Sequence, residues 1–202
     1  MFVEHLSWVV PRSQRESALN VLAQLHHHMD ASGGLIRALA GSDVYNPSNL
    51  VSLTFWKSWE DLARFLAGPK SAILNDYSGA GAERPKPHHF EVVWDWPQEE
   101  VDTVSGESHW AFYRFATERR HIEALLDGLR HYVPTLGSHD GFRCAGIWLD
   151  KNNDSLPGLA TQWSGKEVPD LEFPEAIRSA ASETVRSVAR IKVTDPYHLR
   201  VV

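Results

Sequence analysis

The chain contains a single cysteine, Cys144, among its 202 residues. One cysteine excludes an intrachain disulfide, and no second cysteine or suitably spaced histidine stands near it to complete a zinc site. We therefore expect Cys144 to be a small, buried residue on a strand. A chain of this length can bury a core large enough to fold without a metal or a disulfide.

Long apolar runs and an excess of basic residues are also absent. No stretch approaches the roughly 18 apolar residues of a membrane-spanning helix, and the N-terminus lacks the layout of a signal peptide. We therefore expect a cytoplasmic protein without a membrane partner. The net charge of −6 provides no general basic surface for nucleic acid. Glycine-rich phosphate loops, nucleophile elbows and paired-carboxylate spacings are missing from the sequence as well.

Aromatic side chains and histidines are abundant, with eight tryptophans and eleven histidines. Such enrichment is typical of a ligand cavity, but also of a tightly packed core. The consecutive His26, His27 and His28 lie within a helical pattern, so their side chains point in directions about 100° apart and cannot all bind one ligand. We expect His26 to lean toward the core and His27 to face solvent.

The hydrophobic periodicity predicts the same order of elements twice. In the first half, we expect strands at 2–10, 35–45, 50–56 and 88–96, and helices at 12–31, 58–67 and 70–77. In the second half, we expect strands at 109–116, 141–149, 158–163 and 188–194, and helices at 118–133 and 175–186. The sequence between the halves is acidic and has no periodicity. We therefore predict a first repeat over 1–97, a linker over 98–107 and a second repeat over 108–202.

The two halves align at a constant offset of 107 residues, which pairs Thr54 with Thr161 and Trp56 with Trp163. Each half would form a four-stranded antiparallel sheet with helices on one face. The opposite faces carry large apolar residues, and packing the two sheets against each other would cover them. The predicted fold is α+β, with tandem ferredoxin-like β-α-β-β-α-β repeats whose sheets pack into an α/β barrel.

The sequence is organised around residues 50–66, where a strand ending in Trp56 leads into a helix. Ser58 is expected to cap that helix, with Asp61 in the reciprocal position. With the following Gly68-Pro69, short helix and final strand, this stretch resembles the antibiotic biosynthesis monooxygenase family of the dimeric α/β-barrel superfamily. Members of that family usually pair two single-unit chains, whereas this chain would hold both units.

This resemblance implies an enzyme that oxygenates an anthrone- or quinol-type aromatic polyketide in antibiotic biosynthesis. A phenol that is deprotonated in a dry aromatic pocket can itself reduce dioxygen. The implied partners are a small aromatic substrate and dioxygen. No cofactor is required, or reduced flavin serves as co-substrate with a flavin reductase. The oligomeric state would be a monomer with an internal pseudo-dimer, or a homodimer.

Two alternatives come from other functional classes. The first is a haem-binding or haem-degrading barrel, and the second is a non-oxidative polyketide cyclase or ligand-binding barrel. The family typically carries a histidine on the second helix, where this sequence has Phe65 in the first half and Glu172 in the second. The missing histidine makes haem an unlikely cofactor, and no metal site is expected.

Histidines at the strand positions 5, 88 and 89 are candidates for the base, because an imidazole can deprotonate a phenol near neutral pH. His88 and His89 are consecutive on one strand and should point to opposite faces. Arg114 lies on an otherwise apolar strand and should have a carboxylate or a ligand enolate as its partner. The candidate catalytic residues are His5, His88 and His89, and the candidate substrate-binding residues are Trp56, Trp59, Phe65, Tyr77 and Arg114.

Overall fold

The computed structural model describes residues 1–43, 48–78, 86–97, 108–151, 156–164, 171–181 and 183–193. The predicted linker over 98–107 lies outside these residues. The described residues up to His89 form one compact unit, here called unit 1, and those from Phe90 onward form unit 2. Both units combine antiparallel strands with helices, which confirms the α+β class. The repeat boundary predicted at residue 97 stays a prediction.

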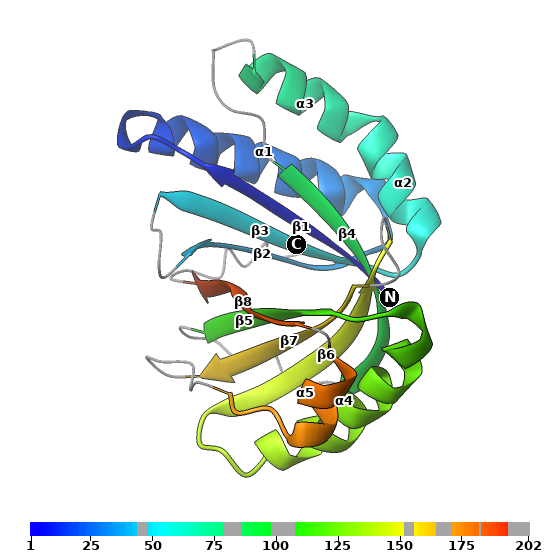
Figure 1. Cartoon of the computed structure of the whole chain (residues 1–202). Helices are drawn as coiled ribbons and strands as arrows, with labels where there is room; N and C mark the ends of the chain where they lie inside the picture. The colour runs from blue at the N-terminus through cyan, green and yellow to red at the C-terminus, as the bar shows by residue number, and fades with distance from the viewer. Residues whose placement is uncertain are drawn as a thin grey trace. The chain divides into compact units, whose positions relative to one another are not determined.

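In unit 1, three helices lie on one face of an antiparallel sheet in the order β1-β3-β2 (Figure 1). The strands are β1 (Phe2–Val9), β2 (Leu35–Asp43) and β3 (Asn49–Trp56), and the helices are α1 (Arg15–Ser32), α2 (Trp59–Ala67) and α3 (Pro69–Ser78). A short 3-10 turn, Arg12–Gln14, precedes α1. These bounds agree with the predicted elements to within a few residues.

The local signals in the sequence account for the helix ends. The predicted apolar stripe of α1 is buried, with Leu25 at 0% exposure, and the helix ends at Gly33, whose φ of 73° lies in the region that glycine favours. At the start of α2, Ser58 accepts a hydrogen bond from the Asp61 backbone N–H at 3.1 Å. The Ser58 hydroxyl donates in return to the Asp61 carboxylate at 2.8 Å. The predicted cap by Ser58 is confirmed, and the Asp61 side chain contacts the Ser58 hydroxyl.

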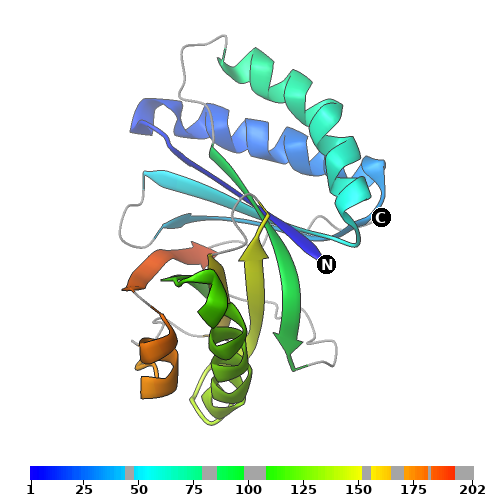
Figure 2. The same ribbon diagram turned by 45° about the vertical axis from the view of Figure 1, so that its right-hand side comes forward.

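Unit 2 has helices on one face of an antiparallel sheet in the order β8-β5-β7-β6-β4 (Figure 2). Its strands are β4 (Lys86–Trp96, from Phe90 onward), β5 (Ser108–Ala116), β6 (Phe142–Asp150), β7 (Pro157–Ser164) and β8 (Glu183–Val193), and its helices are α4 (Ile122–Leu136) and α5 (Glu175–Ala180). The 3-10 turn Arg119–His121 precedes α4. None of the helices in the described ranges is long and apolar enough to cross a membrane.

The same buried hydrogen bond occurs in both units. The Trp56 indole N–H donates to the Thr54 hydroxyl at 2.8 Å, and the Trp163 indole N–H donates to the Thr161 hydroxyl at 2.9 Å. Both tryptophans are at most 1% exposed. A buried indole N–H requires an acceptor. In each unit, the hydroxyl of a threonine two residues earlier on the same strand face is that acceptor.

The pairs from Phe90 to Trp96 join β4 to β6 in unit 2, a pairing that was not predicted. The alternation of apolar and polar residues identifies a strand but does not indicate which strand pairs with it. The helix predicted over 175–186 ends at Ala180, because Ala181 is already extended at φ −91° and ψ 122°. The chain then forms β8, which pairs along the length of β5.

His26 generates a prediction about stability. Its side chain is 2% exposed, its Nε2 lies 3.2 Å from the Ser52 hydroxyl, and burial lowers its pKa to about 4. His27 is exposed, as predicted. The unfolded chain therefore binds a proton on His26 that the folded chain excludes. The free energy of unfolding should fall as the pH drops from about 6.5 to about 4, by about 3 kcal/mol from this group.

Urea unfolding at a series of pH values measures this effect. The variant His26→Gln replaces the imidazole by a group that does not titrate, so its stability should depend less on pH over that interval. His27→Gln, on the exposed side of the same helix turn, should keep the wild-type pH dependence. An unchanged pH dependence in His26→Gln would show that burial of this imidazole does not control acid stability.

Candidate functional site

The candidate site is built around Glu4, a carboxylate on the helix-facing side of β1. Glu4 shares that side with Leu6 and Trp8, which belong to the apolar core packed against the helices. It lies opposite Thr54 in the β1–β3 register and is 1% exposed. A charged side chain at such a position needs partners that compensate for the loss of water.

Two basic residues converge on the same oxygen of Glu4. Lys70, near the start of α3, donates from Nζ to Oε1 and is itself 5% exposed. His89 of β4 places Nε2 3.3 Å from that oxygen. We call these three residues the Glu4–Lys70–His89 network. Because Lys70 and Glu4 carry opposite charges, the buried pair is neutral overall.

The network keeps Glu4 ionised. Burial by itself raises the pKa of this carboxyl, but the hydrogen bond from His89 and the charge and hydrogen bond of Lys70 outweigh burial and leave the pKa below its ordinary value. Glu4 is therefore an acceptor at neutral pH rather than an acid. Its second oxygen, Oε2, is buried and has no hydrogen-bond partner among the described residues.

Trp59 and His89 lie at the more exposed end of the network. The Trp59 ring meets the His89 ring edge-on, with centroids 5.7 Å apart and planes at 80°, and also contacts Phe2 at 5.9 Å. Trp59 is half-buried. The His89 side chain is 15% exposed, compared with 1% for Glu4. His89 is therefore more accessible to solvent than the carboxylate that it contacts.

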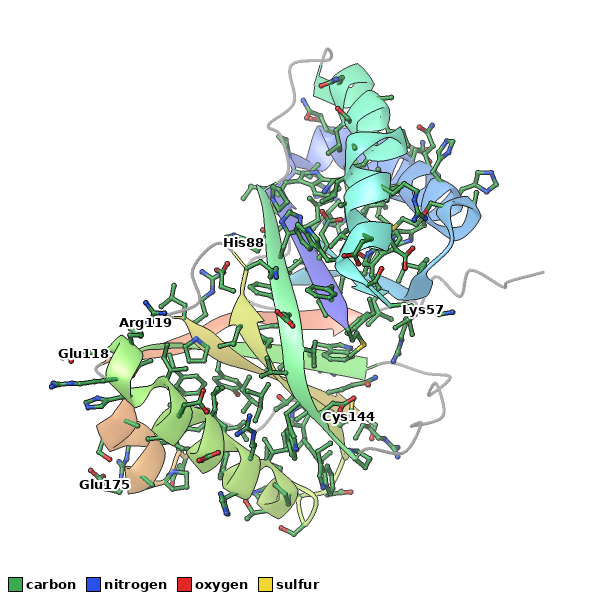
Figure 3. The ribbon with its side chains drawn as sticks, turned by 90° about the vertical axis from the view of Figure 1, so that its right-hand side faces the viewer. Lys57, His88, Glu118, Arg119, Cys144 and Glu175 are labelled. Carbon is green, nitrogen blue, oxygen red and sulfur yellow. The ribbon has the colours of Figure 1, made fainter. Side chains whose placement is uncertain are left out.

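The other two candidate histidines form a separate pair. His5 and His88 stack with ring centroids 6.0 Å apart and an interplanar angle of 29°. His5 follows Glu4 on β1, and His88, labelled on its strand in Figure 3, precedes His89 on β4. Side chains alternate along a strand, so the contacts agree with the expectation that His88 and His89 face opposite ways.

Trp56 and Phe65 lie inside the core of unit 1. Both are 0% exposed, and their rings stack at 5.3 Å with planes 25° apart. Their observed contacts are packing contacts, and their ligand-binding role stays a prediction. The side chain of Tyr77 is outside the described residues.

Arg114 belongs to unit 2, where its guanidinium nitrogen lies 3.9 Å from a carboxylate oxygen of Asp150 and its Cζ lies 5.8 Å from the centre of the Phe90 ring. The expected carboxylate partner of Arg114 is therefore present. Cys144 is half-buried on β6 and donates from Sγ to the Gln162 side-chain carbonyl at 3.3 Å. No group of three or more potential metal ligands is found within the described residues.

Sequence reasoning missed Glu4 and Lys70. The signal for Glu4 was present, because the alternation places this carboxylate on the same strand face as Phe2, Leu6 and Trp8. A charged residue among inward apolar positions indicates a buried partner. Nothing comparable indicated Lys70, since a lysine in the first turn after Gly68-Pro69 could equally face solvent.

No protein-family profile matches the chain, and no curated protein matches it. Solved structures with similar folds include a candidate monooxygenase from Fusobacterium nucleatum, with a TM-score of 0.66 and 9% identity over 96% of this chain and 91% of that chain. A candidate monooxygenase from Lactobacillus acidophilus has a TM-score of 0.65 and 9% identity over 95% and 92%. An anthrone oxidase-like protein has a TM-score of 0.66 and 17% identity over 96% and 90%. At these identities, the likeness concerns the fold.

The network makes a prediction about stability. Lys70→Met leaves the Glu4 carboxylate buried without its cation and should lower the free energy of unfolding by about 3–5 kcal/mol at neutral pH. The loss should shrink as the pH falls, because protonation then neutralises the buried carboxyl. The double variant Glu4→Met/Lys70→Met removes both charges and should recover most of the loss, since apolar pairs often replace buried ion pairs without cost.

Denaturant unfolding of the wild type, Glu4→Met, Lys70→Met and the double variant measures this coupling as a double-mutant cycle. Losses that simply add would contradict the assignment of a coupled, buried ion pair.

Proposed function

We propose that the protein is an oxygenase of a hydroxylated aromatic compound, with His89 as the base and Glu4 as the residue that positions it. The observation that carries this proposal is the contact between the buried Glu4 carboxylate and His89 Nε2. A histidine held by a buried carboxylate, with its ring partly exposed, is suited to taking a proton from a bound phenol or enol.

The arrangement assigns different tasks to the two ring nitrogens. When Nε2 donates its hydrogen to Glu4 Oε1, Nδ1 carries the lone pair and can accept the proton of the substrate. The anion formed from the substrate balances the charge of the resulting imidazolium, because Lys70 already neutralises the Glu4 carboxylate. Trp59, edge-on to His89, would supply an apolar face for a planar substrate beside the base.

An anthrone-type substrate gives a balanced reaction without an external reductant. The base removes a proton, the resulting anion passes electrons to dioxygen, and a CH₂ group becomes a carbonyl. One oxygen atom enters the product and the other leaves as water, so the substrate supplies all four electrons. For a substrate that cannot supply them, reduced flavin from a reductase is the co-substrate we propose.

The similar folds of two candidate monooxygenases and an anthrone oxidase-like protein support this class of reaction. The finer part of the proposal is that the substrate is an aromatic polyketide in antibiotic biosynthesis. The organisation as a tandem single-chain repeat belongs to the same proposal, supported by the matching Thr54–Trp56 and Thr161–Trp163 hydrogen bonds.

Oxygen uptake with an anthrone tests the reaction. Wild-type protein should consume one dioxygen per anthrone and form the quinone, and a reaction under ¹⁸O₂ should place one labelled atom in the product. His89→Gln keeps a hydrogen-bonding group near Glu4 but cannot accept the proton, so kcat should fall by about 10²- to 10⁴-fold. The matched control His88→Gln, one residue away on the opposite strand face, should stay near the wild-type rate.

Equal losses in the two glutamine variants would contradict the choice of His89. Tight binding of the anthrone without oxygen uptake, with or without reduced flavin, would instead indicate a non-oxidative ligand-binding protein.

A further inference from the structure

The two oxygens of Glu4 differ in their surroundings, and this difference points to a ligand. Lys70 and His89 both approach Oε1, whereas Oε2 is buried without a hydrogen-bond partner among the described residues. We propose that Glu4 Oε2 accepts a hydrogen bond from the hydroxyl group of a neutral aromatic ligand. This inference rests on the proposed function in its choice of an aromatic ligand, and it assigns Glu4 a direct binding role in addition to positioning His89.

The charge of the network determines what kind of ligand group fits. An anionic group would be repelled by the Glu4 carboxylate, and a cationic group would add an uncompensated charge to a pair that Lys70 already neutralises. A neutral O–H or N–H group satisfies Oε2 without changing the buried charge. A phenolic hydroxyl provides this donor on a flat, apolar body.

The aromatic part of the ligand follows from the residues beside the network. Trp59 and Phe2 contact each other, and Trp59 also contacts His89. These half-buried rings lie at the end of the network that solvent reaches through His89. An aromatic ring that entered there could pack on indole and phenyl surfaces while its hydroxyl pointed toward Glu4.

Unit 2 provides an internal comparison. In the strand register, Ala111 lies opposite Thr161 in unit 2, as Glu4 lies opposite Thr54 in unit 1. The residue 107 positions after Lys70 is Ile177, on α5. Ala111 and Ile177 are both 0% exposed and belong to the apolar core of unit 2. In unit 2, apolar residues fill the space between the sheet and its helices. Packing alone therefore does not require the charged pair that occupies this space in unit 1.

The test compares two ligands with the same ring system, only one of which can donate a hydrogen bond. Isothermal titration calorimetry without oxygen would measure the binding of 2-naphthol and of 2-methoxynaphthalene to the full chain at neutral pH. The methyl ether has the same ring system but cannot donate a hydrogen bond. Wild-type protein should bind 2-naphthol about 10-fold more tightly or better, as expected for a hydrogen bond to a charged acceptor.

The variant Glu4→Met/Lys70→Met removes the acceptor together with its cation, which avoids leaving either charge buried alone. Its preference for 2-naphthol over the ether should fall to about onefold, and its unfolding curve confirms that it is folded. Equal affinities in the wild type, no measurable binding of either ligand, or a preference that survives in the double variant would each overturn the inference.

The binding test is independent of turnover, because neither ligand needs to react. A hydroxyl preference that depends on Glu4, together with no oxygen uptake from any anthrone, would support the binding site and reject the oxygenase. Oxygen uptake without a hydroxyl preference would support the oxygenase and reject the role of Oε2.

Discussion

A carboxylate buried between a sheet and its helices sets the main constraint on unit 1. Glu4 is 1% exposed, and an ionised group in that position is tolerated only with close compensation. Lys70 supplies the charge from α3, and His89 supplies a hydrogen-bonding partner from β4. Side chains from β1, α3 and β4 therefore meet at one oxygen atom, Glu4 Oε1. The half-buried Trp59 then lies beside the most exposed member of this network.

The energetic logic of the network favours a functional explanation over a purely structural one. Replacing a buried ion pair with apolar residues of similar volume is often neutral or stabilising, and the corresponding layer of unit 2 contains Ala111 and Ile177 in such packing. Unit 1 nevertheless keeps a charged pair and a buried oxygen that lacks a described donor. Polar groups of this kind concentrate where a protein binds or transforms a ligand.

The sequence predicted what local rules determine. Alternation identified β1 and β3, the spacing of apolar residues identified α1, and Ser58 with Asp61 marked the start of α2. The opposite directions of His88 and His89 followed from strand geometry in the same way. The sequence also predicted a carboxylate or a ligand enolate as the partner of Arg114, but it did not identify Asp150 as the residue that supplies the carboxylate.

Features that depend on distant partners could not be predicted in this way. Residues Phe90–Trp96 pair with β6. The alternation of apolar and polar residues marks this segment as a strand but does not identify its partner strand. Lys70 and Glu4 are 66 positions apart in the chain, and no local pattern links them. The contact between Trp56 and Phe65, which stack on each other at 0% exposure, was not predicted either. Aromatic content alone does not distinguish a cavity from a packed core.

A crystal structure of the wild-type protein with 2-naphthol bound would show directly whether Glu4 binds the ligand. We expect the naphthol oxygen at about 2.5–2.7 Å from Glu4 Oε2, the range for a hydrogen bond from a hydroxyl to a carboxylate. The ring should lie beside Trp59, with Lys70 and His89 still on Oε1. A naphthol bound away from Glu4, or a protein donor occupying Oε2 while the ligand is present, would show that Oε2 is not the ligand's acceptor.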